Sequence, residues 1–245
     1  MTKQRTAGLS CLCLLLLQWF SISAYGQHTE QEADRYLREM MPRTLERLAQ
    51  YKEEARTNPP QEELVFFLGS ATTAGWDLDR WFPEYETVKR GFGGTMIDEN
   101  LQLAKEVVIP YKPSTIVLYA GENDTWLGKP PELTLQHFKE LVATLKSEIP
   151  NTQLIYVTMK PSIRWWSKVD EMRKANQLIE DYIATENHVY YVDTFTSMLD
   201  QHGNPRRDYL GSDDLHLTDL GFEVWSNAVR PVIKAAETNY RLLTR

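Results

Sequence analysis

The sequence is almost free of cysteine. Its 245 residues include two, Cys11 and Cys13, and both lie within the first 26 positions. The remainder of the chain cannot form a disulfide, so its fold must depend on a hydrophobic core. A chain of this length suffices for one sizeable core, and no repeat, low-complexity tract or long linker divides it. We therefore expect a single domain over residues 27–245.

The first 26 residues lack acidic side chains and have the order of a secretory signal peptide. Lys3 and Arg5 come first, an apolar run occupies residues 9–20, and small residues end at Gly26. The run is too short to span a bilayer comfortably, and neither cysteine follows a convincing lipobox. We expect cleavage after Gly26, no stable membrane insertion afterwards, and a secreted or periplasmic protein.

Positive charge is also in deficit. The chain carries 27 lysines and arginines against 34 aspartates and glutamates, a net charge of −7 that becomes about −9 once Lys3 and Arg5 are removed. No cluster of basic residues offsets this balance, which disfavours binding to nucleic acid and to anionic lipid. We expect a small-molecule or neutral polymeric partner.

The remaining sequence alternates short apolar runs with helical patterns. The runs are nearly continuous in hydrophobicity, as in strands buried on both faces of a parallel sheet; they cover residues 64–68, 115–119, 154–157 and 189–192, with a shorter segment at 86–88. Helical patterns cover residues 28–57, 96–108, 133–148, 169–186 and 218–237. This alternation predicts a flavodoxin-like three-layer α/β/α sandwich with a mainly parallel sheet. In the first helical segment, Leu45, Leu48 and Tyr51 are expected to face the core.

Near the C-terminus, Asp213 and His216 stand three residues apart in a turn-like stretch. A carboxylate at this spacing can hold the near nitrogen of an imidazole and leave the far nitrogen free as a base. Taken alone, the pattern is more often a surface histidine beside an acidic loop. No second histidine or carboxylate set accompanies it at ligand spacing, so the sequence predicts no metal site.

Two further segments follow predicted strands, where open parallel sheets bind their ligands. The glycine-rich turn at residues 91–94 can present the backbone N–H of Gly94 to an anion. Asn123 follows the next strand and can project an amide donor toward the same point. Each feature by itself is typical of an ordinary turn, but two converging donors would form an oxyanion hole.

Together and in this order, these segments resemble the SGNH, or GDSL-like, hydrolase family, which is named after a serine, a glycine, an asparagine and a histidine in four blocks. The resemblance extends over residues 64 to about 232. It is greatest to the bacterial branch whose first block reads Gly-Ser-Ser, and the stretches 90–94, 117–124 and 160–162 also look like that branch.

The resemblance implies a role for each of these residues. Gly94, Asn123 and the backbone N–H of residue 71 would form the oxyanion hole, and Asp213 and His216 would be the acid and base of a catalytic triad. It implies a serine ester hydrolase that needs no cofactor and acts on small-molecule or carbohydrate esters.

The sequence departs from this family at the nucleophile. The serine should stand two residues after Gly69, where this chain has Ala71, and Trp76 supports that alignment. Alanine has no side-chain oxygen and cannot form an acyl-enzyme. Three interpretations remain open: an introduced serine-to-alanine change, a natural protein that binds an ester or glycan without cleaving it, and a displaced nucleophile at Ser70 or Thr72. The retained base and oxyanion residues favour the first, and the third is the least favoured because neighbouring residues in a turn point in different directions.

The sequence-based hypothesis is therefore an acyl or acetyl esterase disabled at position 71, with a non-catalytic periplasmic carbohydrate- or ester-binding protein as the alternative. Ser70, Trp126 and Trp165 are expected to contact the substrate. Ordinary packing is the competing role for the tryptophans near strand ends, which also include Trp76, Trp81 and Trp166. The absence of a long apolar lid favours short acyl groups over long ones.

Overall fold

The structure is a computed structural model that describes residues 41–58 and 63–245. The predicted signal peptide and residues 28–40 of the first predicted helical segment lie outside the described residues. Within the described part of the chain, no helix is both long enough and apolar enough to cross a membrane.

A five-stranded parallel sheet forms the centre of the molecule. Its strands are β1 (Val65–Gly69), β2 (Thr87–Gly91), β3 (Thr115–Tyr119), β4 (Gln153–Val157) and β5 (Val189–Val192). They lie in the order β2-β1-β3-β4-β5, and every neighbouring pair is parallel. Three of the strands are completely buried, as their near-continuous hydrophobicity predicts. The predicted fold class is confirmed.

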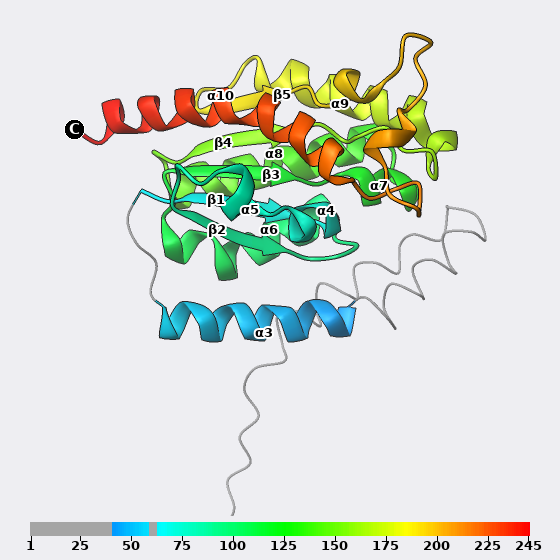
Figure 1. The fold of residues 1–245 in the computed structure, drawn as a ribbon. Coiled ribbons are helices and arrows are strands. Elements are labelled where there is room, and N and C mark those ends of the chain that lie inside the picture. Colours follow the sequence, from blue (N-terminus) through cyan, green and yellow to red (C-terminus); the bar gives the residue numbers. More distant parts are fainter. Residues whose placement is uncertain (1–40, 59–62) are drawn as a thin grey trace, which may run out of the picture.

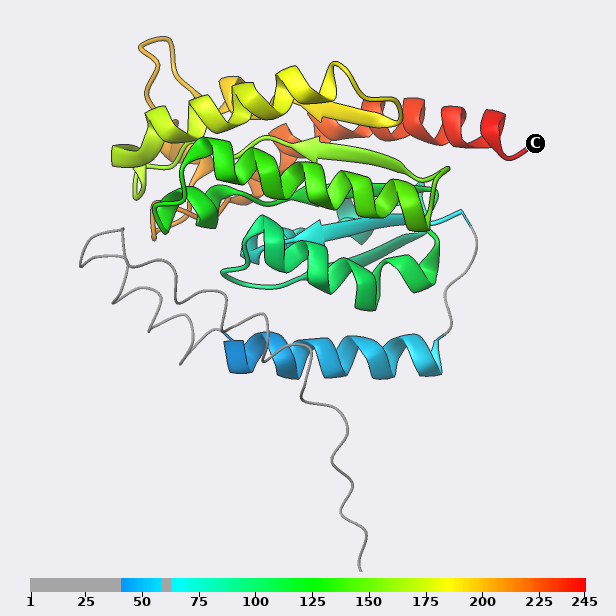
Figure 2. The same ribbon diagram turned by 180° about the vertical axis from the view of Figure 1, so that it is seen from behind.

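Helices cover both faces of the sheet (Figures 1 and 2). One face carries α6 (Ile97–Val107), α8 (Pro131–Glu148) and α9 (Val169–Ile183), and the other carries α10 (Asp219–Leu243). Three short helices lie between the strands: α4 (Ala71–Gly75) and α5 (Leu78–Trp81) between β1 and β2, and α7 (Glu122–Trp126) after β3. Single 3₁₀ turns lie at Ile109–Tyr111, Trp166–Lys168, Thr196–Met198 and Arg207–Tyr209. The two apolar layers between sheet and helices make up the hydrophobic core.

Helix α3 (Met41–Thr57) lies beside the layer that contains α6 (Figure 1). Leu48 and Tyr51 contact the core, and the Tyr51 ring meets the edge of Phe92 at 5.3 Å between centroids. The expectation that Leu45 shares this face is wrong, because its side chain is 42 % exposed. A helix turns once every 3.6 residues, so positions spaced by three drift around its surface and leave the packed stripe.

Candidate active site

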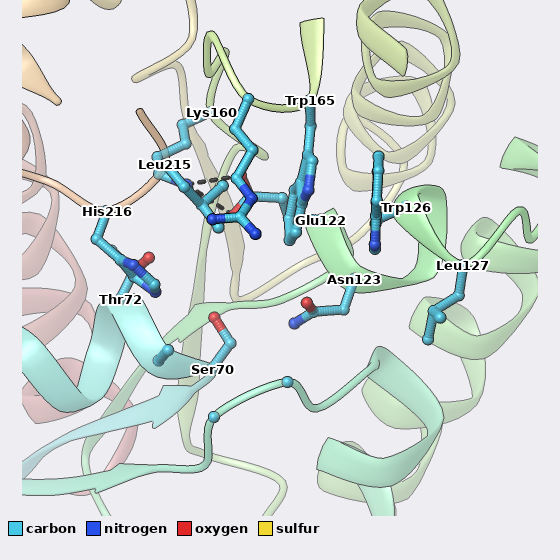
Figure 3. Close-up of a pocket in the computed structure, with 14 residues that line it drawn as sticks. Ser70, Thr72, Glu122, Asn123, Trp126, Leu127, Lys160, Trp165, Leu215 and His216 are labelled. Carbon is cyan, nitrogen blue, oxygen red and sulfur yellow. Dashed lines mark hydrogen bonds and ion pairs between the residues drawn. The ribbon is translucent and has the colours of Figure 1, made fainter. Parts of the chain in front are cut away.

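A cavity of about 350 Å³ opens at the carboxyl ends of the strands. It is bordered by the segments that follow β1, β2, β3 and β4 and by the loop before α10. All the predicted site residues except Asp213 line it directly: Ser70, Ala71, Gly94, Asn123, Trp126, Trp165 and His216. Figure 3 shows the side chains of Ser70, Asn123 and His216 directed toward the same space. The topology thus brings together residues that are as much as 146 positions apart in the chain.

Asp213 and His216 form a pair at the mouth of this cavity. The Nδ1 atom of His216 lies 2.5 Å from Oδ2 of Asp213, while Oδ1 accepts the backbone N–H groups of Leu215 at 3.1 Å and His216 at 3.0 Å. The hydrogen bond from His216 lowers the pKa of the Asp213 carboxyl from 3.8 to about 2. An ionised Asp213 holds the proton on Nδ1, so Nε2 of the neutral ring is available as a base.

Hydrogen-bond donors without acceptors line the cavity together with Ala71. The Nδ2 of Asn123 donates one hydrogen to the carbonyl of Thr95 at 2.9 Å, which fixes the amide and leaves its second hydrogen free. The backbone N–H groups of Ala71 and Gly94 have no acceptor among residues 41–58 and 63–245. Gly94 adopts a φ of 80°, a conformation that glycine adopts readily. These are the donors that an oxyanion hole requires.

Two glycines allow the segment bearing Ala71 to approach the sheet closely. A Cβ on Gly91 would lie 2.3 Å from the backbone nitrogen of Ala74, so glycine at the end of β2 makes room for α4. A Cβ on Gly69 would lie 2.1 Å from the carbonyl oxygen of Tyr119. The position of residue 71 therefore depends on two residues without side chains.

A buried ionic cluster that the sequence did not predict lies at this site. The ammonium group of Lys160, which is 0 % exposed, donates to both carboxylate oxygens of Glu122 at 2.6 and 2.8 Å. Tyr119 also donates its hydroxyl to that carboxylate. Burial, together with the charge of Glu122, raises the pKa of Tyr119 well above its usual value and keeps it a donor. Both Glu122 and Lys160 lie in stretches that resemble the family, but no local pattern predicts that they pair.

The tryptophans divide into a cavity wall and core residues. The rings of Trp126 and Trp165 stack with centroids 5.1 Å apart and planes 12° apart, and both line the cavity (Figure 3). Trp76 is buried in the core, where its indole N–H donates to Ser226 at 2.9 Å. Trp81 and Trp166 do not line the cavity. Arg164 does line it, and its guanidinium has no hydrogen-bond or ion-pair partner in the described part of the chain.

A separate group of ionisable side chains lies outside the cavity. Asp98, Asp124 and His137 offer ligand atoms within 4.8 Å of one another, an arrangement that the sequence spacing did not reveal. The ammonium of Lys129 lies 2.9 Å from Asp98 and 3.3 Å from Asp124. The two carboxylates therefore already share a cation, and the group lies apart from the cavity.

A charged carboxylate–imidazole pair facing a set of unpaired N–H donors is the apparatus of acyl transfer. The doubly wound sheet and the groups at the carboxyl ends of its strands resemble those of acyl hydrolases, although Ala71 offers no nucleophilic oxygen. Residues 55–224 match the GDSL-like lipase/acylhydrolase family, and the chain belongs to this family. None of the curated proteins compared with the chain matches it in sequence.

Several solved structures share the fold. A protein from Streptococcus pneumonia described as a platelet activating factor is 18% identical, with a TM-score of 0.73 over 85% of this chain and 99% of that one. A GDSL-like lipase from Bacteroides thetaiotaomicron is 22% identical, with a TM-score of 0.67 over 77% and 99%. A catalytic mutant of an acetylxylan esterase from Geobacillus stearothermophilus is 19% identical, with a TM-score of 0.56 over 71% and 94%. At these identities the likeness concerns the fold alone.

Proposed function

We propose that the cavity is a short-chain acyl ester site in which Ala71 takes the place of the nucleophilic serine. The observation that carries this proposal is that the Asp213-bound His216, the unpaired donors and Ala71 all border one cavity. As it stands, the chain would bind an ester but form no acyl-enzyme. Loss of a serine nucleophile lowers turnover by about 10⁶-fold in a well-studied hydrolase.

The same geometry defines the reaction of a serine at position 71. The serine oxygen attacks the ester carbonyl as Nε2 of His216 removes its proton, and Asp213 stabilises the imidazolium that results. The carbonyl oxygen becomes an oxyanion that accepts hydrogen bonds from the backbone N–H groups of residue 71 and Gly94 and from Asn123. His216 then protonates the departing alcohol. Water attacks the acyl-enzyme by the same route in reverse and releases the acid.

The size and lining of the cavity support a short acyl group, acetyl included, on a small alcohol or a sugar. A volume of about 350 Å³ is at the lower end for ligand pockets. The stacked Trp126 and Trp165 rings provide an apolar wall. An acetylxylan esterase among the structural neighbours supports acetylated carbohydrate as the first substrate class to test.

The test compares the native chain with its Ala71→Ser variant on p-nitrophenyl acetate, butyrate and octanoate. We expect turnover to appear in the serine variant, to rise by several orders of magnitude above the native chain, and to decrease with acyl length. The double variant Ala71→Ser/His216→Ala should lose that gain. Turnover by the native chain that depends on Ser70 would contradict the assignment of position 71 and make Ser70 the nucleophile.

The second candidate function is non-catalytic binding of an ester or carbohydrate, and the observation in its favour is Ala71 itself. It predicts that Ala71→Ser hydrolyses neither the aryl esters nor acetylated sugars although the variant remains folded. Esterase activity in the serine variant supports the first function, whereas binding of acetylated sugar without hydrolysis supports the second.

A further inference from the structure

The carboxylate of Asp124 is buried next to the site but has no part in the reaction described above. The residue follows the oxyanion donor Asn123 in α7, and its side chain is completely enclosed. Its Oδ2 atom accepts the backbone N–H of Ile97, the first residue of α6, at 3.0 Å. Asp124 does not border the cavity, so any effect on the reaction must act through the residues that it holds.

The hydrogen bond to Asp124 joins two segments that carry different oxyanion donors. Gly94 lies in the turn between β2 and α6, three residues before Ile97, and Asn123 lies in α7 after β3. Asn123 itself donates to the carbonyl of Thr95 at 2.9 Å. Two adjacent residues of α7 therefore bind this turn at two points, and both bonds set the position of Gly94 relative to Asn123.

We propose that Asp124 is a positioning residue that holds the N–H of Gly94 and the amide of Asn123 at the spacing that one oxyanion requires. The inference rests on the proposed function, because a reaction through an oxyanion needs both donors to point at the same atom. Donors stabilise such a charge best when they need not rearrange as it forms. A misplacement of about 1 Å can lower a rate by about 100-fold.

A buried cation fixes the Asp124 carboxylate from its other side. The Nζ atom of Lys129 lies 3.3 Å from Oδ1 of Asp124 and 2.9 Å from Oδ1 of Asp98, the second residue of α6. Burial raises the pKa of the Asp124 carboxyl, and the charge of Lys129 opposes that shift. The ammonium group thus links α7 to α6 a second time and restricts rotation of the Asp124 carboxylate.

The turn that carries Gly94 also has hydrogen bonds that do not involve α7. Nδ2 of the buried Asn100 in α6 donates to Oγ1 of Thr95 at 3.1 Å and to the carbonyl of Met96 at 2.7 Å. The turn should therefore keep its shape when the Asp124 carboxylate is removed. We expect it to shift relative to α7 as one unit, which changes the spacing of the donors without unfolding the site.

The kinetic test uses Ala71→Ser as the parent protein and p-nitrophenyl acetate as the substrate. Adding Asp124→Ala removes the acceptor of the Ile97 N–H and should lower kcat by about 10- to 100-fold with little change in KM, because the donors act in the transition state. Asp124→Asn keeps an oxygen that can accept this N–H and should retain most of kcat. An unchanged kcat in Asp124→Ala, equal losses in the two variants, or a change confined to KM would overturn the inference.

Glu237 supplies the matched control. It is also a buried carboxylate, but it accepts the hydroxyl hydrogens of Ser114 and Thr115 at the start of β3, the opposite end of the sheet from the cavity. Glu237→Ala in the same parent should lower stability and leave kcat unchanged, measured at a temperature at which thermal unfolding shows every variant to be folded. A decrease in kcat equal to that of Asp124→Ala would overturn the inference, because the effect would then be one of stability.

A spectroscopic measurement separates this inference from the proposed function. The amide NMR resonance of Gly94 in the native chain reports the surroundings of this donor without any reaction. Asp124→Ala should shift that resonance, whereas Asp124→Asn and Glu237→Ala should leave it close to its native position. This pattern without esterase activity in Ala71→Ser would support the positioning role and remove the esterase proposal. Activity in Ala71→Ser with no shift in Asp124→Ala would preserve the proposed function and overturn the inference.

Discussion

At the scale of single residues, the Asp213 carboxylate is the most constrained group of the site. It accepts two backbone N–H groups and the imidazole of His216, and the last of these interactions chiefly sets its low pKa of about 2. The dyad carboxylate is therefore ionised throughout the ordinary pH range, which any role of His216 as a base requires.

This pKa has a consequence for stability in acid. Because the pKa of Asp213 is lower in the folded than in the unfolded chain, its ionised form stabilises the fold above about pH 4, and this contribution is lost as the pH falls toward about 2. We expect the free energy of unfolding to fall less for Asp213→Asn than for the native chain between pH 6 and pH 3. Urea unfolding at both pH values measures this change in the free energy of unfolding. Equal decreases in the two proteins would show that the pKa of Asp213 is not lowered in the folded chain.

Local and distant residue pairs differ in how far the sequence predicts them. Asp213 and His216 are three residues apart, so a turn suffices to join them and their pairing is predictable. Gly94 and Asn123 could be placed together only through the expected strand order. The direction of the Ser70 hydroxyl depends on the detailed turn between β1 and α4, which no sequence pattern specifies.

At the scale of elements, the Glu122–Lys160 pair links the segment that contains α7 to the loop after β4. Each partner comes from a different strand end, and both line the cavity together with Asn123, Arg164 and Trp165. Two buried charges are costly to desolvate, so each depends on the other.

Removing one partner of this pair should therefore lower the free energy of unfolding more than removing both charges. Lys160→Met leaves Glu122 buried and unpaired and should lower the free energy of unfolding by about 3–5 kcal/mol. Lys160→Met/Glu122→Gln should recover much of that loss, because the Tyr119 hydroxyl can still donate to the amide oxygen. Urea unfolding of both variants checks this, and a double variant less stable than the single one would show that the pair does not act as a unit.

The strands and the long helices were predictable from the sequence, and the short helices were not. Continuous apolar runs predict strands such as β1 and β3. A periodic apolar face predicts helix α9. Helices α4, α5 and α7 have five residues or fewer, too few for a period to be visible. The last helix extends to Leu243, beyond the predicted end at residue 237. The prediction ended early because the apolar face that packs on the sheet ends there, and Leu242 and Leu243 are exposed.

At the scale of the whole molecule, the two apolar layers explain how the fold can exist without disulfides. Both faces of the sheet are covered, and the large side chains Trp76, Trp225 and Phe138 are completely enclosed. Cysteine is confined to the first 26 residues, a segment that we propose is removed on export.

The proposed removal of the signal peptide predicts the first residue of the exported chain. When the full sequence is expressed in a bacterium, the protein recovered from the periplasm or medium should begin at Gln27 and contain no thiol. Intact mass and N-terminal sequencing measure this. A product that retains Cys11 and Cys13 at the membrane would instead indicate an uncleaved anchor.

The donors around Ala71 are backbone groups or belong to other residues, so none of them depends on the side chain at that position. Every alanine codon becomes a serine codon through a single substitution at its first base. A lineage carrying this cavity could thus gain or lose a reactive hydroxyl in one step, with the scaffold and its hydrogen bonds unchanged. Selection could therefore change such a protein from a binding protein to an enzyme, or the reverse, and every variant on the way would remain folded.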